Sequence, residues 1–247
     1  MDLRREEQRL SFCRDTVIPI VRETARENIG RTYDVTSKGH GNFVTSIDQK
    51  IEGELKRRLA EALPDAVFLA EESGEDAGRK ARYKWIIDPI DGTSNFIFGF
   101  PYAVSVALQE VKSGRTLLGV VFVPETDTVY YAAWKKGSYR AAGGLTEPLH
   151  VKRFQENEGI VIFGMPYDRT KSDKILAIAG EYYRTSSDLK RIGPASLDIC
   201  RVASGAAKTY VELDLKEWDV AAGILILQEA GGTYEKRDDL MIFSSGK

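Results

Sequence analysis

Residues 85–96 read WIIDPIDGTSNF, and this stretch decides more about the chain than any other. An apolar run ends in two carboxylates, Asp88 and Asp91, with a proline between them that fixes the backbone angle φ and stiffens the turn. Two rigidly placed carboxylates repel each other unless a cation lies between them, so the stretch predicts a metal site. Gly92 and Thr93 follow directly and can open a helix whose free backbone N–H groups would hold an anion such as phosphate.

Composition limits the classes of protein to consider. With 247 residues, 43% of them apolar, the chain can bury a large core as one domain or two, and its net charge of −2 gives no general attraction to nucleic acid or anionic membrane. Cys13 and Cys200 lie far apart and predict buried free thiols rather than a disulfide or zinc site. With only two histidines, the chain is a poor candidate for a histidine-based zinc site or a Ser-His-Asp triad. The charged first ten residues and the absence of an apolar run of about 20 residues predict a cytoplasmic protein without a membrane span.

The hydrophobic pattern predicts a mixed α+β protein. The expected helices cover 3–28 with a kink at Pro19, 46–63, 173–183, 195–204 and 218–230; the expected strands cover 43–45, 66–70, 85–91, 103–108, 117–123, 129–133, 138–141, 159–163, 189–192 and 208–212, with short strands near 233 and 241. Residues 38–42 read as a flexible loop, and Ser46 is expected to cap the helix after it, with Gln49 three residues on. The meander over 103–141 and the later strand–helix alternation suggest layered sheets in one unit, with pseudo-subdomains of about 1–145 and 146–247.

Three further acidic segments accompany the first. They are Glu71-Glu72-Ser73 after an expected strand, Trp218-Asp219-Val220-Ala221-Ala222-Gly223 at a helix start, and NFVTSID over residues 42–48, which ends in Asp48. Each has an ordinary structural interpretation as well: a solvated acidic turn for the two glutamates, and stabilisation of a helix N-terminus for Asp219 and Asp48.

Taken in their order along the chain, the four segments resemble the inositol monophosphatase family, the magnesium-dependent, lithium-sensitive sugar phosphatases. The resemblance covers about residues 38–232. The resemblance implies a five-layer αβαβα sandwich, a homodimer and a small phosphorylated polyol or sugar as the ligand. It also implies two Mg²⁺ ions, with a weaker third near Glu71 and Mn²⁺ as a substitute. The ligands that it implies are Glu71, Asp88, the Ile90 carbonyl, Asp91 and Asp219. Oxygen-only ligands suit these ions better than zinc or copper.

The resemblance also assigns the remaining site residues. It implies that Thr93 and Asp48 orient and deprotonate the attacking water, with Glu71 completing the catalytic group. The substrate contacts that it implies are Lys38, Gly92, Thr93, Gly193, Ala195, Glu212 and Asp219. Pro194 and Ser196 depart from the residues frequent in the family, which leaves the sugar preference open.

The predicted function is therefore hydrolysis of a phosphomonoester, with inositol-1-phosphate as the first candidate substrate. Alternatives with the same fold are fructose-1,6-bisphosphate, a nucleotide 3′-phosphate, histidinol phosphate and NADP. A different class, a regulatory RNA-polymerase-associated protein that retains the metal cage, also remains open. The absence of basic tracts argues against direct nucleic-acid binding.

Overall fold

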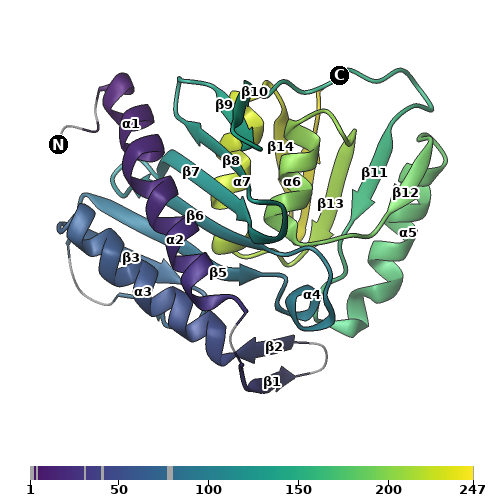
Figure 1. Ribbon diagram of the computed structural model, residues 1–247. Helices are drawn as coiled ribbons and strands as arrows, with labels where there is room; N and C mark the ends of the chain where they lie inside the picture. Colours follow the sequence, from purple (N-terminus) through teal and green to yellow (C-terminus); the bar gives the residue numbers. More distant parts are fainter. Residues whose placement is uncertain (1–2, 4, 31, 40–41, 77–79, 247) are drawn as a thin grey trace.

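The fold is a stack of five layers in a computed structural model that describes residues 3, 5–30, 32–39, 42–76 and 80–246. Helices near the N-terminus cover one face of a large sheet, two helices lie between this sheet and a smaller one, and α5 (Ser172–Tyr183) covers the outer face of the smaller sheet (Figure 1). This arrangement confirms the α+β class and the layered αβαβα sandwich. Among the described residues, every helix is too short or too polar to cross a lipid bilayer.

The large sheet has eight strands in the order β10-β9-β8-β7-β6-β5-β3-β4. Their bounds are Ala66–Ala70 (β3), Gly74–Glu75 (β4), Tyr83–Asp91 (β5), Ala103–Glu110 (β6), Arg115–Val123 (β7), Thr128–Ala133 (β8), Ser138–Ala142 (β9) and Leu145–Pro148 (β10). The meander from β6 to β9 is confirmed. Two strands of this sheet, β4 and β10, were missed by the sequence reasoning. Both are short and largely exposed, so neither shows an apolar pattern.

The smaller sheet has the order β12-β11-β13-β15-β14. The strands are Ile160–Phe163 (β11), Asp188–Lys190 (β12), Thr209–Leu213 (β13), Thr233–Arg237 (β14) and Leu240–Ser244 (β15). β11 runs parallel to both β12 and β13, so the carboxyl ends of these strands face the same edge. The strand–helix alternation predicted for this half is confirmed.

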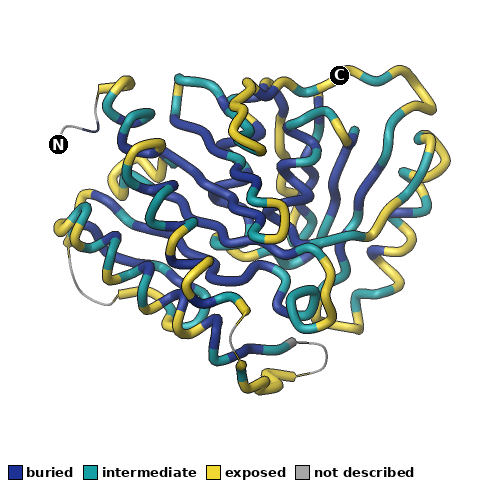
Figure 2. Tube along the Cα trace, viewed as in Figure 1, coloured by how far each residue is buried: buried dark blue, intermediate teal, exposed yellow. Residues whose placement is uncertain are grey.

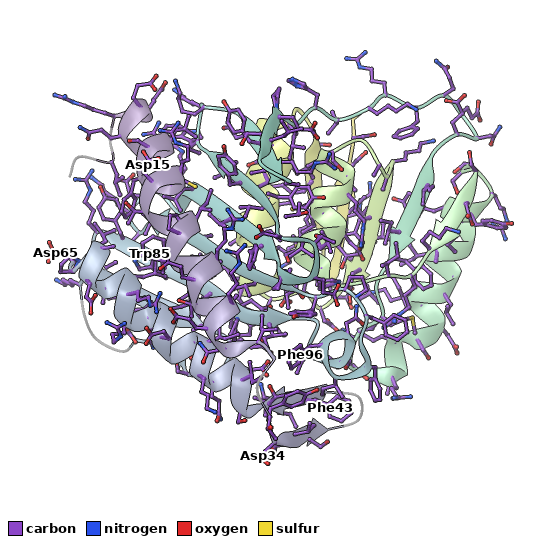
Figure 3. All side chains as sticks on the ribbon, viewed as in Figure 1. Asp15, Asp34, Phe43, Asp65, Trp85 and Phe96 are labelled. Atoms are coloured by element: carbon purple, nitrogen blue, oxygen red, sulfur yellow. The ribbon has the colours of Figure 1, made fainter. Side chains whose placement is uncertain are left out.

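Three hydrophobic cores hold the layers together. One lies between the N-terminal helices and the large sheet, one between the two sheets around α6 (Ala195–Ala203) and α7 (Glu217–Glu229), and one beneath α5. Neighbouring residues of β5 face different cores, since Trp85 belongs to the first and Ile86 to the second. Figure 2 shows the central strands almost wholly buried, and Figure 3 shows Trp85 beneath the N-terminal helices. Because α7 packs on the large sheet and α6 on both, the two halves share this helical layer, and the division near residue 145 stays a prediction.

The N-terminal helix contains an irregular turn where the kink was predicted. An α-helix, α1 (Glu6–Phe12), passes into a π-helical turn, Cys13–Val17, and continues as α2 (Ile18–Asn28), with Pro19 in its first turn. Proline lacks the N–H that a continuous α-helix would use, and a wider turn before it accommodates that loss. Both cysteines are buried and free, as expected.

Two local predictions for residues 35–49 were wrong. The cap of α3 (Ser46–Ala62) is Thr45, whose hydroxyl accepts backbone N–H bonds while the Asp48 carboxylate accepts the Thr45 N–H in return, so the capping box begins one residue earlier than predicted. Residues 35–39 form strand β1, which pairs with β2 (Asn42–Thr45), so Lys38 lies in a hairpin strand rather than in a loop. His40 and Gly41 lie outside the described residues.

Candidate active site

A single cleft of about 870 Å³ lies where the carboxyl end of β5 faces the loops of the smaller sheet. All five predicted metal ligands line it: Glu71, Asp88, Ile90, Asp91 and Asp219. Glu71 follows β3, the next three lie at the end of β5, and Asp219 lies in the first turn of α7. The structure therefore brings together residues that are up to 148 positions apart in the chain.

A bulge in β5 places its two aspartates on one side of the strand. Asp88 pairs with Ser105 and Asp91 with Ala103, so three steps along β5 match two steps along β6. Without the extra residue, positions three apart would face opposite sides of the sheet. Pro89 suits this irregular position because it has no N–H to offer the ladder. The bulge thus turns both carboxylates into the cleft.

Burial and mutual repulsion make these carboxyl groups hard to ionise. Burial, followed by repulsion from Glu71, Asp91 and Asp219, raises the pKa of Asp88 well above its ordinary value. Burial likewise raises the pKa of Glu71 to about 7 and that of Asp91 to about 6, and it raises the pKa of Asp219 well above the ordinary value. Such an acidic cluster favours a bound cation, which would restore the ionised forms.

The hydrogen bonds around the cluster hold two of the carboxylates and leave one oxygen free. Asp91 Oδ2 accepts the Ser196 N–H at 2.7 Å at the start of α6, and Asp219 Oδ2 accepts the Lys216 N–H at 2.6 Å at the start of α7. The helix-capping role of Asp219 is therefore confirmed. Asp88 Oδ1 is buried and has no hydrogen-bond partner among the residues that the structure describes.

The donor set fits a hard divalent cation. It consists of carboxylate oxygens and one main-chain carbonyl, and an orphaned buried carboxylate oxygen such as Asp88 Oδ1 is a group that a cation would satisfy. No three Asp, Glu, His or Cys side chains in the described part of the chain already surround one point closely enough to hold an ion.

Thr93 and Asp48 meet as predicted. Thr93 Oγ1 donates to Asp48 Oδ1 at 3.0 Å and also lies 3.2 Å from the Ile90 carbonyl oxygen. Asp48 is fully buried, and burial raises its pKa above the ordinary value. Thr93 lines the cleft whereas Asp48 lies behind it, so the carboxylate reaches the cleft through the hydroxyl.

The segment after the aspartates is tied to the opposite wall of the cleft. Gly92 has φ +89° and precedes the short helix α4 (Thr93–Phe98), as expected; a Cβ atom on it would lie 3.0 Å from Pro194 Cβ. Asn95 Nδ2 donates to the carbonyl oxygens of Pro101, at 2.7 Å, and of Ile192, at 3.1 Å. Close approach and hydrogen bonds thus fix α4 against residues 191–195. On its other side α4 contacts β2, and Figure 3 shows Phe96 near Phe43.

All the predicted substrate residues except Lys38 line the cleft: Gly92, Thr93, Gly193, Ala195, Glu212 and Asp219. Lys38 Nζ lies 2.7 Å from Glu72 Oε1 and 3.8 Å from Glu71 Oε1, which places this lysine beside the acidic cluster rather than in the lining of the cleft. Its phosphate-steering role stays a prediction.

Several lining residues were missed by the sequence reasoning. Met165, Tyr167 and Arg169 follow β11 and form an outer wall of the cleft. Parallel strands bind ligands beyond their carboxyl ends, so this rule could have identified the loop after β11. Asp198 was also missed: its Oδ2 accepts the Gly193 N–H at 2.9 Å and so holds the loop before α6. A buried acid in the first turn of a helix is the signal for such a role.

A layered sandwich with an acidic cleft at the end of its central strand is the arrangement found in a family of phosphatases, which comparison with known proteins identifies. A model of the inositol monophosphatase family matches residues 7–239, so the chain belongs to this family.

Named relatives carry two kinds of description. The chain is 39% identical over 201 residues to a protein of Neisseria meningitidis named putative Nus factor SuhB, covering 79% of this chain and 74% of that one. It is 34% identical over 222 residues to the fructose-1,6-bisphosphatase/inositol-1-monophosphatase of Aquifex aeolicus, covering 86% and 80%. The solved structure of the extragenic suppressor protein suhB from Bartonella henselae has a TM-score of 0.84 at 28% identity, covering 95% and 93%.

Proposed function

We propose that the chain is a magnesium-dependent phosphomonoesterase for a small polyol or sugar phosphate, with inositol-1-phosphate as the first candidate substrate. The observation that carries this proposal is the group of four carboxyl groups lining one cleft, with Asp88 Oδ1 buried and unpartnered. Asp91 and Asp219 each accept a backbone N–H at a helix start, but this does not explain why four carboxyl groups that repel one another share one cleft. Such a group is suited to hold cations against a phosphate.

Two overlapping ligand sets can be assigned. Glu71, Asp88 and the Ile90 carbonyl would hold one ion, and Asp88, Asp91 and Asp219 would hold a second. When bound, Mg²⁺ supplies neutralisation of the phosphoryl charge and activation of the attacking water. The protein contributes the fixed positions of Asp91 and Asp219, each held by a backbone N–H at a helix start.

Proton removal falls to Thr93 and Asp48 in this proposal. Thr93 Oγ1 orients the attacking water at the cleft surface, accepts its proton and passes its own proton to Asp48 Oδ1, 3.0 Å away. Asp48 stays out of solvent and in hydrogen-bonding distance of the hydroxyl, which is the geometry that general-base catalysis requires. None of these steps uses a histidine or a covalent nucleophile.

The test of the proposed function is phosphate release from a substrate panel. The panel contains inositol-1-phosphate, fructose-1,6-bisphosphate, a nucleotide 3′-phosphate, histidinol phosphate and NADP, each measured with Mg²⁺ and with EDTA. We expect turnover that depends on Mg²⁺ and is fastest on a polyol or sugar phosphate. Absence of turnover on every compound would contradict the proposal.

The relatives named Nus factor SuhB favour a second candidate function, which is the regulatory, RNA-polymerase-associated role that the sequence left open. Direct binding of the purified chain to RNA polymerase, measured by surface plasmon resonance, separates the two functions. Binding without phosphate release on the panel would favour the regulatory role, and release without binding would favour the enzyme.

Replacing Thr93 by Val should lower kcat by about 10²- to 10⁴-fold, the usual range for loss of a proton-transfer group. Valine keeps the shape but removes the hydroxyl that joins Asp48 to the cleft. Steady-state kinetics on the best substrate measures the effect, with Thr146→Val on the exposed strand β10 as the matched control. A Thr93→Val enzyme within threefold of wild type would exclude the proposed proton path.

A further inference from the structure

The carboxyl group of Glu212 lies in a tight position in the wall of the cleft. Tyr210, two residues earlier on the same strand, donates a hydrogen bond from its hydroxyl group to Glu212 Oε2. Residues two apart on a strand share a face, so ring and carboxylate lie side by side. Glu212 lines the cleft, but Tyr210 does not.

Tyr210 itself cannot move easily. It is fully buried, and its ring stacks on Phe243 with centroids 5.4 Å apart and planes at 19°. Phe243 in turn stacks on Tyr234 at 6.4 Å, so the three rings form a row across β13, β15 and β14. Because a buried hydroxyl without an acceptor is costly, the bond to Glu212 is the stable arrangement for this ring.

Gly164 confines Glu212 from the other side. A Cβ atom at position 164 would lie 1.8 Å from Glu212 Oε2 and 2.5 Å from Oε1. The Gly164 N–H donates to the Val211 carbonyl oxygen at 3.0 Å, which fixes this backbone beside β13. The carboxyl group therefore occupies the space that a side chain at 164 would fill.

One oxygen of Glu212 remains available. Oε2 is engaged by Tyr210, and within the described part of the chain Oε1 accepts no hydrogen bond. A carboxylate with one oxygen anchored and the other facing a cleft is well placed to accept a bond from a ligand hydroxyl.

We propose that Tyr210 is a positioning residue for substrate selection, which holds Glu212 through Oε2 so that Oε1 accepts a hydrogen bond from a substrate hydroxyl. This inference rests on the proposed function. It adds that the preference for hydroxyl-bearing phosphate esters depends on a hydroxyl group that never touches the substrate. Gly164 contributes by leaving the carboxylate one place to lie.

The experiment compares Tyr210→Phe with Tyr234→Phe, which removes a hydroxyl from the exposed end of the same row of rings. We expect Tyr210→Phe to lower kcat/KM on inositol-1-phosphate about tenfold, as for one hydrogen bond to a charged group. The loss should fall mainly on KM and stay below twofold on p-nitrophenyl phosphate, which has no hydroxyl to bind. Tyr234→Phe should match wild type on both substrates.

Two further variants test whether Tyr210 acts through Glu212. Adding Tyr210→Phe to Glu212→Ala should cost nothing beyond the single Glu212→Ala change, since the partner is already absent. Gly164→Ala, which displaces the same carboxyl group from the opposite side, should show the same selective loss on inositol-1-phosphate. Equal losses on the two substrates, or full additivity in the double variant, would overturn the inference.

Failure of the inference is distinct from failure of the proposed function. A selective loss in Glu212→Ala with no effect of Tyr210→Phe would overturn the positioning role and leave the phosphatase intact. If the wild type releases no phosphate, ¹³C NMR titration of the glutamate carboxyls still decides the role. The pKa of Glu212 should rise in Tyr210→Phe and stay constant in Tyr234→Phe, since Asp91, Asp198 and Arg191, which also act on it, are unchanged in both. An unchanged pKa in Tyr210→Phe would overturn the inference.

Discussion

Asp88→Asn is expected to abolish Mg²⁺-dependent phosphate release, with a fall of at least about 10³-fold in kcat/KM. Metal-based charge stabilisation supplies several kcal/mol to such a reaction, and each 1.36 kcal/mol corresponds to about a factor of ten in rate. Asp88 belongs to both proposed ligand sets, and its Oδ1 has no hydrogen-bond partner among the described residues. Loss of its charge should therefore weaken both proposed metal sites. Asparagine keeps the shape of the side chain and removes that charge.

The same substitution should make the metal-free protein more stable. Repulsion from Glu71, Asp91 and Asp219 acts on Asp88, and a neutral amide removes it. A rise in melting temperature in EDTA together with lost activity identifies a functional carboxylate, since functional sites often cost stability. Asp65→Asn is the control, because Asp65 is exposed and precedes β3, at the opposite end of that strand from Glu71. Activity within tenfold of wild type would contradict the proposed ligand sets.

The second large effect is a fall in the stability of the metal-free protein as pH rises. Burial first of all raises the pKa of Glu71 and Glu212 to about 7 and that of Asp91 and Asp198 to about 6, above their ordinary values of 4.5 and 3.8. The folded protein therefore binds more protons than the unfolded chain between these limits, and the free energy of unfolding decreases with pH there. A shift of two pKa units corresponds to about 2.7 kcal/mol, so the effect is measurable even where the groups act on one another.

The contribution is fully present below about pH 4 and is lost as pH rises through about 6 to 7. Mg²⁺ should reverse the trend, because it binds the ionised carboxylates and is linked to folding by mass action. Melting temperatures at pH 5, 6, 7 and 8, in EDTA and in millimolar Mg²⁺, test this directly. The lowered pKa values of Glu54 and Asp239, about 2 and set chiefly by hydrogen bonds to arginine and lysine side chains, affect stability only at lower pH. A melting temperature in EDTA that rises steadily from pH 5 to 8 would refute the prediction.

The sequence predicts most helices and strands well, because the apolar periodicity that identifies them is a local pattern. The strands from β5 to β9 and the helices α5 to α7 lie within a few residues of their predicted bounds. The predicted metal ligands also gather in one cleft as the motifs imply, since each lies at or just after the end of a strand or opens a helix. Both kinds of prediction depend on residues that are close in the chain.

The errors and omissions have a physical cause in common. The choice of Thr45 over Ser46 as the cap depends on which hydroxyl faces Asp48, whereas propensity alone favours serine at this position. The bonds from Tyr210 to Glu212 and from Asn95 to Ile192, like the packing of Gly164 against Glu212, depend on side-chain geometry or on the meeting of distant segments. Such details are set by tertiary packing and are therefore absent from local patterns.

The bulge in β5 gives the acidic motif an unusual sensitivity to length. Deleting one residue between Asp88 and Asp91 would restore the regular ladder and return the number of steps between the two aspartates to that of β6. The direction of the second aspartate side chain therefore depends on the extra residue that forms the bulge. Substitutions at positions 89 and 90 leave the number of residues intact, and any residue at position 90 keeps the main-chain carbonyl that we propose as a metal ligand. Variation in this segment is thus constrained by the number of its residues before it is constrained by their kind.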